Sequence, residues 1–263
     1  MAAKKKLKPR QTGAGQDHFG FQPVAEENRQ ARVNTVFDSV ATKYDLMNDA
    51  MSGGLHRLWK AHLINRLRPG KGMRLLDLAG GTGDIAFRFL NAVGELEEGA
   101  APVTVCDINP NMLEVGRGRA LDKGYLREIE WLTGNAEDLP LGDETFDAVT
   151  IAFGIRNVTN LEKAIKEAHR VLKPGGRYLV MEFSSGQAPL IRDVYDWYSF
   201  NVIPKIGKVI TGDEAAYEYL VESIRKFPRP KVFAKLMFDA GFVRVAMDQL
   251  AGGIVTLYRG WKI

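Results

Sequence analysis

A cluster of glycines beside two acidic residues is the stretch of the chain best suited to hold a small ligand. In MRLLDLAGGTGDIAFRF, residues 73–89, an apolar run contains Asp77 and leads into a short loop made of Gly80, Gly81, Thr82 and Gly83. Glycine lets the backbone turn sharply and lets a ligand approach the main chain closely. The residues after the loop predict a helix, whose free N–H groups favour an electron-rich ligand group. The loop is therefore a candidate cofactor site.

The same loop also fits a dinucleotide-binding pattern. Residues 81–86 match G-x-G-x-x-A, the phosphate-binding signature of NAD enzymes. The carboxylates of Asp77 and Asp84 would repel a pyrophosphate but tolerate an ammonium or a sulfonium group. An NAD-dependent oxidoreductase is thus the less favoured of two alternatives.

Two later strand ends carry polar groups that suit an adenosyl ligand. Asp107 ends the apolar run PVTVCD and is placed to accept hydrogen bonds from ribose hydroxyls. Asn135 follows the next run and could read an adenine edge, while Ala136 leaves room for the ring. Asp107 alone would serve NAD equally well, so it indicates a ribose without naming the cofactor.

The elements that must position these residues alternate between strand and helix. Apolar runs predict strands at 73–79, 102–108, 128–134, 146–153 and 177–184, and helical patterns lie between them at 83–94, 109–124 and 160–173. Asn109 is the expected cap of the second of these helices, with Pro110 in its first turn. This α/β pattern predicts a mostly parallel sheet covered by helices on both faces.

The two ends of the chain depart from this alternation. Before residue 70, the apolar stripe Val33, Val36, Phe37 and Val40 and a second run from 55 to 67 predict helices. After residue 241, the runs 242–250 and 253–262 flank Ala251-Gly252-Gly253 and predict a hairpin, so that one late strand runs antiparallel to the others.

Composition narrows the function classes. The chain has 263 residues, a net charge of +4 and a single cysteine, which excludes an internal disulfide and leaves no cysteine cluster for zinc. No apolar run reaches the roughly 18 residues of a membrane span, and no secretory signal core is present. These features favour a cytoplasmic protein with no metal site. The first sixteen residues contain five basic residues and no acid.

As a whole, the chain resembles the ubiquinone/menaquinone biosynthesis C-methyltransferase family of class I S-adenosylmethionine-dependent methyltransferases. The resemblance runs from about residue 18 to residue 262. It is carried by the stretches FGFQPVAEENR, VFDSVATKYDLMNDAMSGGLHRLWK, LDLAGGTGD, FGIRNVTN, YLVESIRKFP and GGIVTLYRGWK. It implies a Rossmann-like sheet with S-adenosyl-L-methionine as the cofactor.

The resemblance also implies an organisation of the chain. Residues 1–17 are expected to form a basic disordered tail, and residues 18–263 a single methyltransferase domain. Within this domain we expect a helical cap over 18–70 and a helical lid insertion over 184–241, before the last hairpin.

The family's cofactor contacts correspond to Thr82 in the glycine loop, Asp107 at the ribose and Asn135-Ala136 at the adenine. One position departs from the family pattern, because Ala152 stands where a serine commonly precedes Phe-Gly. The missing hydroxyl should weaken cofactor binding by about 0.5–1.5 kcal/mol. Tyr44 is expected to lie over the cofactor as a gate.

By the same resemblance, the reaction is methyl transfer to a ring carbon of a polyprenylated quinol, either 2-polyprenyl-6-methoxy-1,4-benzoquinol, demethylmenaquinol or both. Arg156 and Asn157 in FGIRN are the expected catalytic residues. Since arginine stays protonated, Arg156 would stabilise the quinol oxyanion while the proton leaves through water or a nearby acid. The aromatic side chains of the lid would line a channel for the isoprenoid tail.

Other readings remain open at this point. A pI of about 9.0 leaves an RNA or another small molecule as an alternative acceptor, although no basic and aromatic binding module indicates nucleic acid. Contact with the inner face of a membrane, with a quinone-biosynthesis complex, or between two copies in a homodimer is compatible with the sequence.

Overall fold

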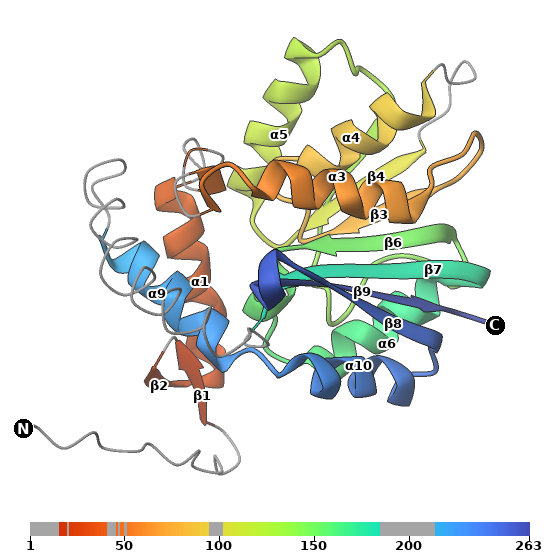
Figure 1. The fold of residues 1–263 in the computed structure, drawn as a ribbon. Helices are drawn as coiled ribbons and strands as arrows, with labels where there is room; N and C mark the ends of the chain where they lie inside the picture. The colour runs from red at the N-terminus through yellow and green to blue at the C-terminus, as the bar shows by residue number, and fades with distance from the viewer. Residues whose placement is uncertain are drawn as a thin grey trace, which may run out of the picture.

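A seven-stranded sheet in the order β5-β4-β3-β6-β7-β9-β8 forms the centre of the computed structural model (Figure 1). The structure describes residues 16–19, 21–40, 46, 48–49, 52–94, 102–184 and 214–263. The strands are β3 (Leu75–Leu78), β4 (Val103–Asp107), β5 (Ile129–Thr133), β6 (Phe146–Ala152), β7 (Leu172–Phe183), β8 (Val243–Leu250) and β9 (Val255–Trp261). Because β9 pairs antiparallel with both β7 and β8, it alone opposes the others in this sheet. The predicted mostly parallel sheet with one late antiparallel strand is confirmed.

Helices cover both faces of the sheet, as the apolar strands require. The helices are α3 (His56–Leu67), α4 (Asp84–Val93), α5 (Pro110–Asp122), α6 (Leu161–Val171) and α10 (Pro230–Asp239). The first three lie on one side of the sheet in Figure 1, and α6 and α10 lie on the other. The order of strands and helices between 73 and 184 agrees with the sequence prediction.

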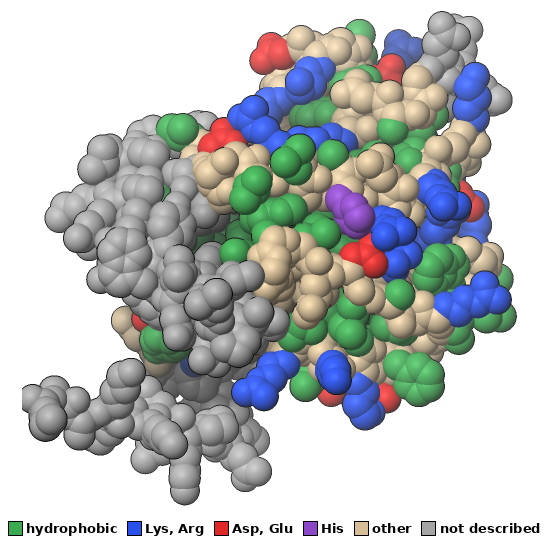
Figure 2. All heavy atoms as spheres, in the orientation of Figure 1, with side chains coloured by type: hydrophobic (Ala, Val, Ile, Leu, Met, Phe, Trp, Pro, Cys, Tyr) green, Lys and Arg blue, Asp and Glu red, His purple; other side chains and the backbone are tan. Residues whose placement is uncertain are grey.

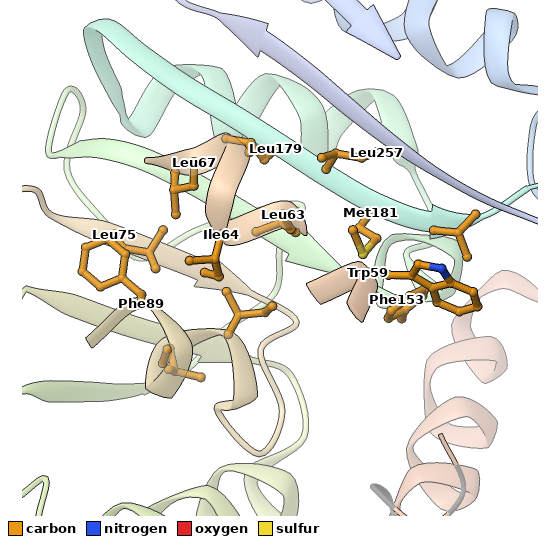
Figure 3. Packing of buried hydrophobic residues seen from close by; sticks show 14 of the residues in the cluster. Trp59, Leu63, Ile64, Leu67, Leu75, Phe89, Phe153, Leu179, Met181 and Leu257 are labelled. Carbon is orange, nitrogen blue, oxygen red and sulfur yellow. The ribbon is translucent and has the colours of Figure 1, made fainter. Parts of the chain in front are cut away.

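Each face has its own apolar core. On one face, Trp59, Leu63 and Leu67 of α3 pack with Phe89 of α4 and with buried strand residues such as Leu75 (Figure 3). On the other face, α6 and α10 pack on the strand side chains of Tyr178 and Tyr258 and on Phe242, which precedes β8. Strand β3 is buried along its whole length, which explains why its sequence shows no alternation of polar residues.

The cap of α5 follows the predicted chemistry. The side chain of Asn109 accepts hydrogen bonds from the backbone N–H groups of Asn111 and Met112, and Pro110 occupies the first turn. These bonds satisfy two of the free N–H groups at the helix start. Since Asn109 lies two residues after Asp107, the cap also fixes the chain where β4 ends.

The N-terminal part differs from the expected all-helical cap. Ahead of α1 (Glu26–Val40) lies a two-stranded hairpin of β1 (Gln16–Phe19) and β2 (Gln22–Ala25). Strands of four residues are too short for an alternation pattern to identify them, so helical periodicity in the following residues dominated the prediction. The expected boundary at residue 17 falls inside β1, and residues 1–15 lie outside the described ranges.

The region expected to be a lid is only partly described, because 185–213 lie outside the described ranges. Helix α9 (Glu214–Lys226) lies beside α1, away from the sheet edge strands (Figure 1). Helix α10 packs instead against α6, β8 and β9 and belongs to the layer that covers the sheet. Strand β7 also begins earlier than predicted, at Leu172, because a register shift opposite Phe146 and Ala148 accommodates the Pro-Gly-Gly segment.

Candidate functional site

A cavity opens at the carboxyl ends of β3, β4 and β6, the edge where ligands of open α/β sheets bind. It encloses about 950 Å³ of empty space, counting the part open to solvent. The predicted site residues that line it are Asp77, Gly80, Gly81, Thr82, Asp107, Asn135, Ala136, Ala152 and Asn157. Gly83 and Arg156 are not among the described lining residues, and Tyr44 lies outside the described part of the chain.

The glycine loop needs glycine for two separate reasons. A Cβ on Gly80 would lie 2.8 Å from both Asp77 Oδ2 and Val105 Cγ1, so a side chain there would displace the acid or the neighbouring strand. Gly83 has a φ of 80°, which L side chains rarely adopt, and begins α4 against the ring of Trp131. The loop therefore brings main chain to the cavity at Gly80 and Gly81, whereas Gly83 packs behind it.

Asp77 is a buried acid with an unused oxygen. Its side chain is 1% exposed, and its Oδ1 accepts a 2.8 Å hydrogen bond from the hydroxyl of Thr150. The other oxygen, Oδ2, has no hydrogen-bond partner among the described residues. Burial raises the pKa of Asp77 to about 7, against the opposing effect of the Thr150 hydroxyl. An ammonium group bound there would supply the missing donor and favour the ionised carboxylate.

Asp107 is held rigidly at the end of β4. Its Oδ2 accepts a 2.9 Å hydrogen bond from the backbone N–H of Gly81, and its Oδ1 accepts one of 2.9 Å from that of Asn109. Burial raises the pKa of Asp107 to about 6, although these backbone donors favour the charged form. Each carboxylate oxygen can accept a further bond, so the group is suited to a pair of ribose hydroxyls.

The remaining predicted contacts surround this pair of acids. The hydroxyl of Thr82 accepts a 2.9 Å hydrogen bond from Arg119, which fixes the side chain inside the loop. The side-chain oxygen of Asn135 accepts a 3.0 Å bond from the backbone N–H of Glu137, which closes a tight turn after β5. Ala136 and Ala152, whose side chains are single methyl groups, also line the cavity.

Arg156 and Asn157 lie in the short 3-10 turn after β6. Asn157 lines the cavity, and its side-chain oxygen accepts a 3.1 Å bond from the hydroxyl of Tyr219. Arg156 is buried and donates from Nη1 to Glu182 Oε1 at 2.9 Å and to the carbonyl of Phe153. Burial raises the pKa of Glu182, and the charge of Arg156 opposes that shift.

A second cavity lies on the Arg156 side of this turn. Its described lining includes the basic residues Arg29, Arg156 and Lys226, together with Val158, Thr159, Leu161, Tyr219, Ser223, Phe227 and Pro228. Val158 lines both cavities, so the turn after β6 is the wall between them. The Nε of Arg156 is buried and has no acceptor among the described residues.

Helix α1 crosses the mouth of the first cavity and is fastened at both ends. Arg29 donates from Nη1 to the carbonyl of Asn157 at 2.8 Å. Nine residues later, Asp38 Oδ1 accepts 2.9 Å bonds from the side-chain amides of Asn109 and Asn111. Between these ties, α1 contributes Gln30, Val33 and Phe37 to the cavity lining. The apolar stripe of the sequence includes Val33 and Phe37, but it gave no sign that they face a ligand.

The ion pairs of Asp84 change the expectation that this residue would repel a pyrophosphate. Its two oxygens accept a 2.7 Å bond from Lys60 and a 2.9 Å bond from Arg88. Although burial acts in the other direction, these cations hold the pKa of Asp84 below its ordinary value. The negative charge of Asp84 is therefore balanced by these two cations. Of the two acids expected to repel a pyrophosphate, only Asp77 remains without a cation bonded to it among the described residues. Lys60, a cavity-lining residue, was not among the predicted site residues.

The comparisons with known proteins agree with the geometry. The model of the ubiE/COQ5 methyltransferase family matches residues 24–262. The chain is 54% identical over 249 residues to a ubiquinone/menaquinone biosynthesis C-methyltransferase of Rhodopseudomonas palustris, covering 94% of this chain and 97% of the relative. It is 48% identical over 279 residues to the human mitochondrial 2-methoxy-6-polyprenyl-1,4-benzoquinol methylase, covering 95% of this chain and 85% of the relative.

Solved structures support the fold assignment. A S-adenosylmethionine-dependent methyltransferase from Thermotoga maritima aligns with a TM-score of 0.59, covering 87% of this chain and 99% of that one at 20% identity. This level of identity speaks for the fold alone. With the match to the family model over most of the chain, and the two relatives at about half identity, the chain belongs to the ubiE/COQ5 methyltransferase family.

Proposed function

We propose that this protein transfers a methyl group from S-adenosyl-L-methionine to a ring carbon of a polyprenylated quinol. The observation that carries the proposal is one cavity lined by Asp77, the glycine loop, Asp107 and Asn135, in a chain of this methyltransferase family. The acceptor class comes from the names of the relatives: the human protein is named a methylase of 2-methoxy-6-polyprenyl-1,4-benzoquinol, and the Rhodopseudomonas protein a C-methyltransferase of ubiquinone/menaquinone biosynthesis. Whether this chain uses a benzoquinol, a naphthoquinol or both is a matter for the assay below.

The residues of the cavity fit the cofactor part by part. The unpartnered Oδ2 of Asp77 suits the ammonium of the methionine part, and the main chain of Gly80 and Gly81 allows close approach. Asp107 suits the ribose hydroxyls, while Asn135 and Ala136 suit the adenine. When bound, S-adenosylmethionine supplies an electrophilic methyl group on its sulfonium.

The acceptor must present a ring carbon with enough electron density to attack that methyl group. Loss of the proton from a ring hydroxyl increases the density on the ortho carbon, and a nearby cation favours the resulting oxyanion. Arg156 lines the second cavity, so its guanidinium can supply that cation to an acceptor bound there. We infer that the quinol ring enters from this side, past the turn at Asn157 and Val158, so that its ortho carbon reaches the methyl group directly.

Two parts of this proposal involve residues outside the described ranges. Tyr44, the expected gate, and the aromatic stretch expected to line an isoprenoid channel both fall there. No helix among the described residues is long and apolar enough to cross a bilayer. A peripheral contact with the membrane that holds the quinol remains part of the proposal.

The direct test is mass spectrometry of products from purified protein, S-adenosylmethionine and chemically reduced demethyl-benzoquinol and demethyl-naphthoquinol analogues. A gain of one methyl group on ring carbon with either analogue supports the proposal, and the relative rates rank the acceptors. Cofactor binding without methylation of either quinol would refute the proposed acceptor class.

A paired substitution separates a catalytic from a structural role of Arg156. Arg156→Leu alone leaves Glu182 buried and unpaired, which should cost about 3–5 kcal/mol of unfolding free energy. The double variant Arg156→Leu/Glu182→Leu removes both charges and should recover much of that stability. If Arg156 stabilises the oxyanion, kcat stays about 10²–10³-fold low in the double variant while the cofactor Kd changes little. Recovery of kcat together with stability would show that the arginine is structural.

A further inference from the structure

Lys60 is a buried cation that faces the cofactor cavity. Its residue is 4% exposed, and it lines the same cavity as Asp77 and Gly80. Buried lysines are rare in proteins unless they are paired, because removal of the ammonium from water is costly. Lys60 is paired, since its Nζ lies 2.7 Å from Asp84 Oδ2. The question is whether this ion pair alone accounts for it.

Asp84 already has another cation. Arg88, one turn further along α4, donates from Nε to Asp84 Oδ1 at 2.9 Å. Arg88 is not among the described residues that line the cavity, and its side chain is 28% exposed. One arginine is enough to balance the charge of Asp84. Lys60 is therefore the cation of this group that a ligand in the cavity can reach.

Packing fixes Lys60 at this position. The neighbouring Trp59 contacts the ring of Phe153 with centroids 6.3 Å apart, and that of Phe183 with centroids 6.1 Å apart (Figure 3). Phe153 directly follows β6, so α3 is anchored at the sheet edge where the cavity opens. An ammonium has three N–H donors, and the hydrogen bonds of Lys60 among the described residues use one of them, toward Asp84.

Among the described residues, the cavity thus contains an acid oxygen that has no donor and a cation with N–H donors that are not used. Asp77 Oδ2 is the first, and Lys60 Nζ is the second. A ligand with an ammonium and a carboxylate on one carbon would satisfy both. We propose that Lys60 binds the α-carboxylate of the cofactor's amino-acid part, while Asp77 binds its α-ammonium. The inference rests on the proposed function, because it takes an adenosyl amino acid as the ligand.

The other ionisable groups near Lys60 do not offer a competing cation. His56 lies on the same helix and bonds to Asp49 at 2.8 Å. Burial lowers the pKa of His56 below its ordinary value, and the charge of Lys60 acts in the same direction against the hydrogen bond to Asp49, so the neutral form of its ring is favoured. A carboxylate in this part of the cavity would therefore meet Lys60 as its positive partner, beside an Asp84 whose charge Arg88 continues to balance.

The test compares two ligands that differ only in the carboxylate. S-adenosylhomocysteine and its decarboxylated analogue are titrated into wild type, Lys60→Met and Arg88→Met by calorimetry, with the melting temperature of each variant measured alongside. Lys60→Met should weaken S-adenosylhomocysteine by about 10–100-fold, the range of a charged hydrogen bond. The dissociation constant of the decarboxylated analogue should change by less than about threefold. Lys60→Met should therefore lose the preference of the wild type for the ligand that carries the carboxylate.

Arg88→Met is the matched control, because it removes the other cation of Asp84 without changing the cavity lining. It should leave the ratio of the two dissociation constants unchanged. The inference would be overturned if Lys60→Met raised the dissociation constants of both ligands equally. It would also be overturned if Arg88→Met reduced the ratio of the two dissociation constants as much as Lys60→Met does. Either result would mean that Lys60 only stabilises α4. Failure of the wild type to bind S-adenosylhomocysteine would instead refute the proposed cofactor, which is a distinguishable result.

Discussion

The affinity for the cofactor should depend on pH through Asp77. This carboxyl group is buried, one of its oxygens has no hydrogen-bond partner in the described part of the chain, and burial raises its pKa to about 7. Only the ionised form can pair with an ammonium group. In the free protein at pH 6 most Asp77 groups are protonated, and each must lose its proton before the ligand binds. Binding should therefore tighten as the pH rises through 7.

The size of the effect follows from the same pKa. The apparent dissociation constant is the intrinsic one multiplied by 1 + 10^(pKa − pH). With a pKa of about 7, the factor is about 11 at pH 6 and about 1.1 at pH 8. S-adenosylhomocysteine should thus bind about tenfold more tightly at pH 8. Asp107, with a pKa of about 6, adds a factor of about 2 at pH 6.

Calorimetric titrations between pH 6 and pH 8 measure this slope, and two controls isolate Asp77. Asp77→Asn cannot ionise and should bind S-adenosylhomocysteine more weakly, with only the small slope that Asp107 contributes. The ligand 5′-methylthioadenosine keeps the ribose but lacks the amino-acid part, so with wild type it should also show only the small slope. A tenfold slope that persists in Asp77→Asn would refute the assignment of the ammonium to Asp77.

Two further substitutions test the loop and the helix that covers it. Gly80→Ala places a Cβ 2.8 Å from Asp77 Oδ2 and Val105 Cγ1. It should reduce the unfolding free energy by about 1–3 kcal/mol in urea titrations and abolish measurable cofactor binding. Normal binding would show that the loop can shift to accommodate the methyl group. Asp38→Ala removes two hydrogen bonds that fasten α1. It should speed dissociation of S-adenosylhomocysteine several-fold in stopped-flow experiments, with less than about 1.5 kcal/mol of lost stability; an unchanged rate would show that α1 does not cover the ligand.

The sheet was predictable because its signals are local. Each strand from β3 to β7 is an apolar run that ends near a glycine, an acid or a proline, and the hairpin of β8 and β9 is marked by Ala251-Gly252-Gly253. The hairpin of β1 and β2 was missed because it has no such pattern in its four-residue strands. The start of β7 was placed too late because Pro174 and the two glycines after it normally interrupt a strand.

The site was predictable to the extent that it is built from strand ends. Parallel strands bring their carboxyl ends to one edge, so Asp77, Asp107 and Asn135 could be expected to meet in one cavity, and they do. Lys60 and the α1 residues come from helices that pack across this edge. Which helix crosses the cavity depends on tertiary packing, such as that of Trp59 on Phe153, which residue spacing does not encode.

The ion-pair partner of Arg156 could not be predicted from the motif that contains it. The acid that pairs with Arg156 is Glu182 on β7, 26 residues away. The sequence distance hides this pair, although the parallel pairing of β6 with β7 makes it close in space. Whether Arg156 acts on the acceptor therefore depends on chemistry that the paired substitution with Glu182 can separate from folding.

The same buried acid that favours the cofactor should make the free protein less stable at neutral pH. The pKa of Asp77 is higher in the folded chain than its ordinary value of 3.8, so the stability that this group contributes is present at low pH and is lost as the pH rises through about 7. Ala79 and Phe153, which directly follow β3 and β6 beside the cavity, add backbone strain with φ values of 48° and 61°. A bound ammonium would stabilise the ionised carboxylate without removing that strain. The edge of the sheet is thus arranged for a ligand at some cost to the empty fold, which is the pattern expected of a binding site rather than of a core.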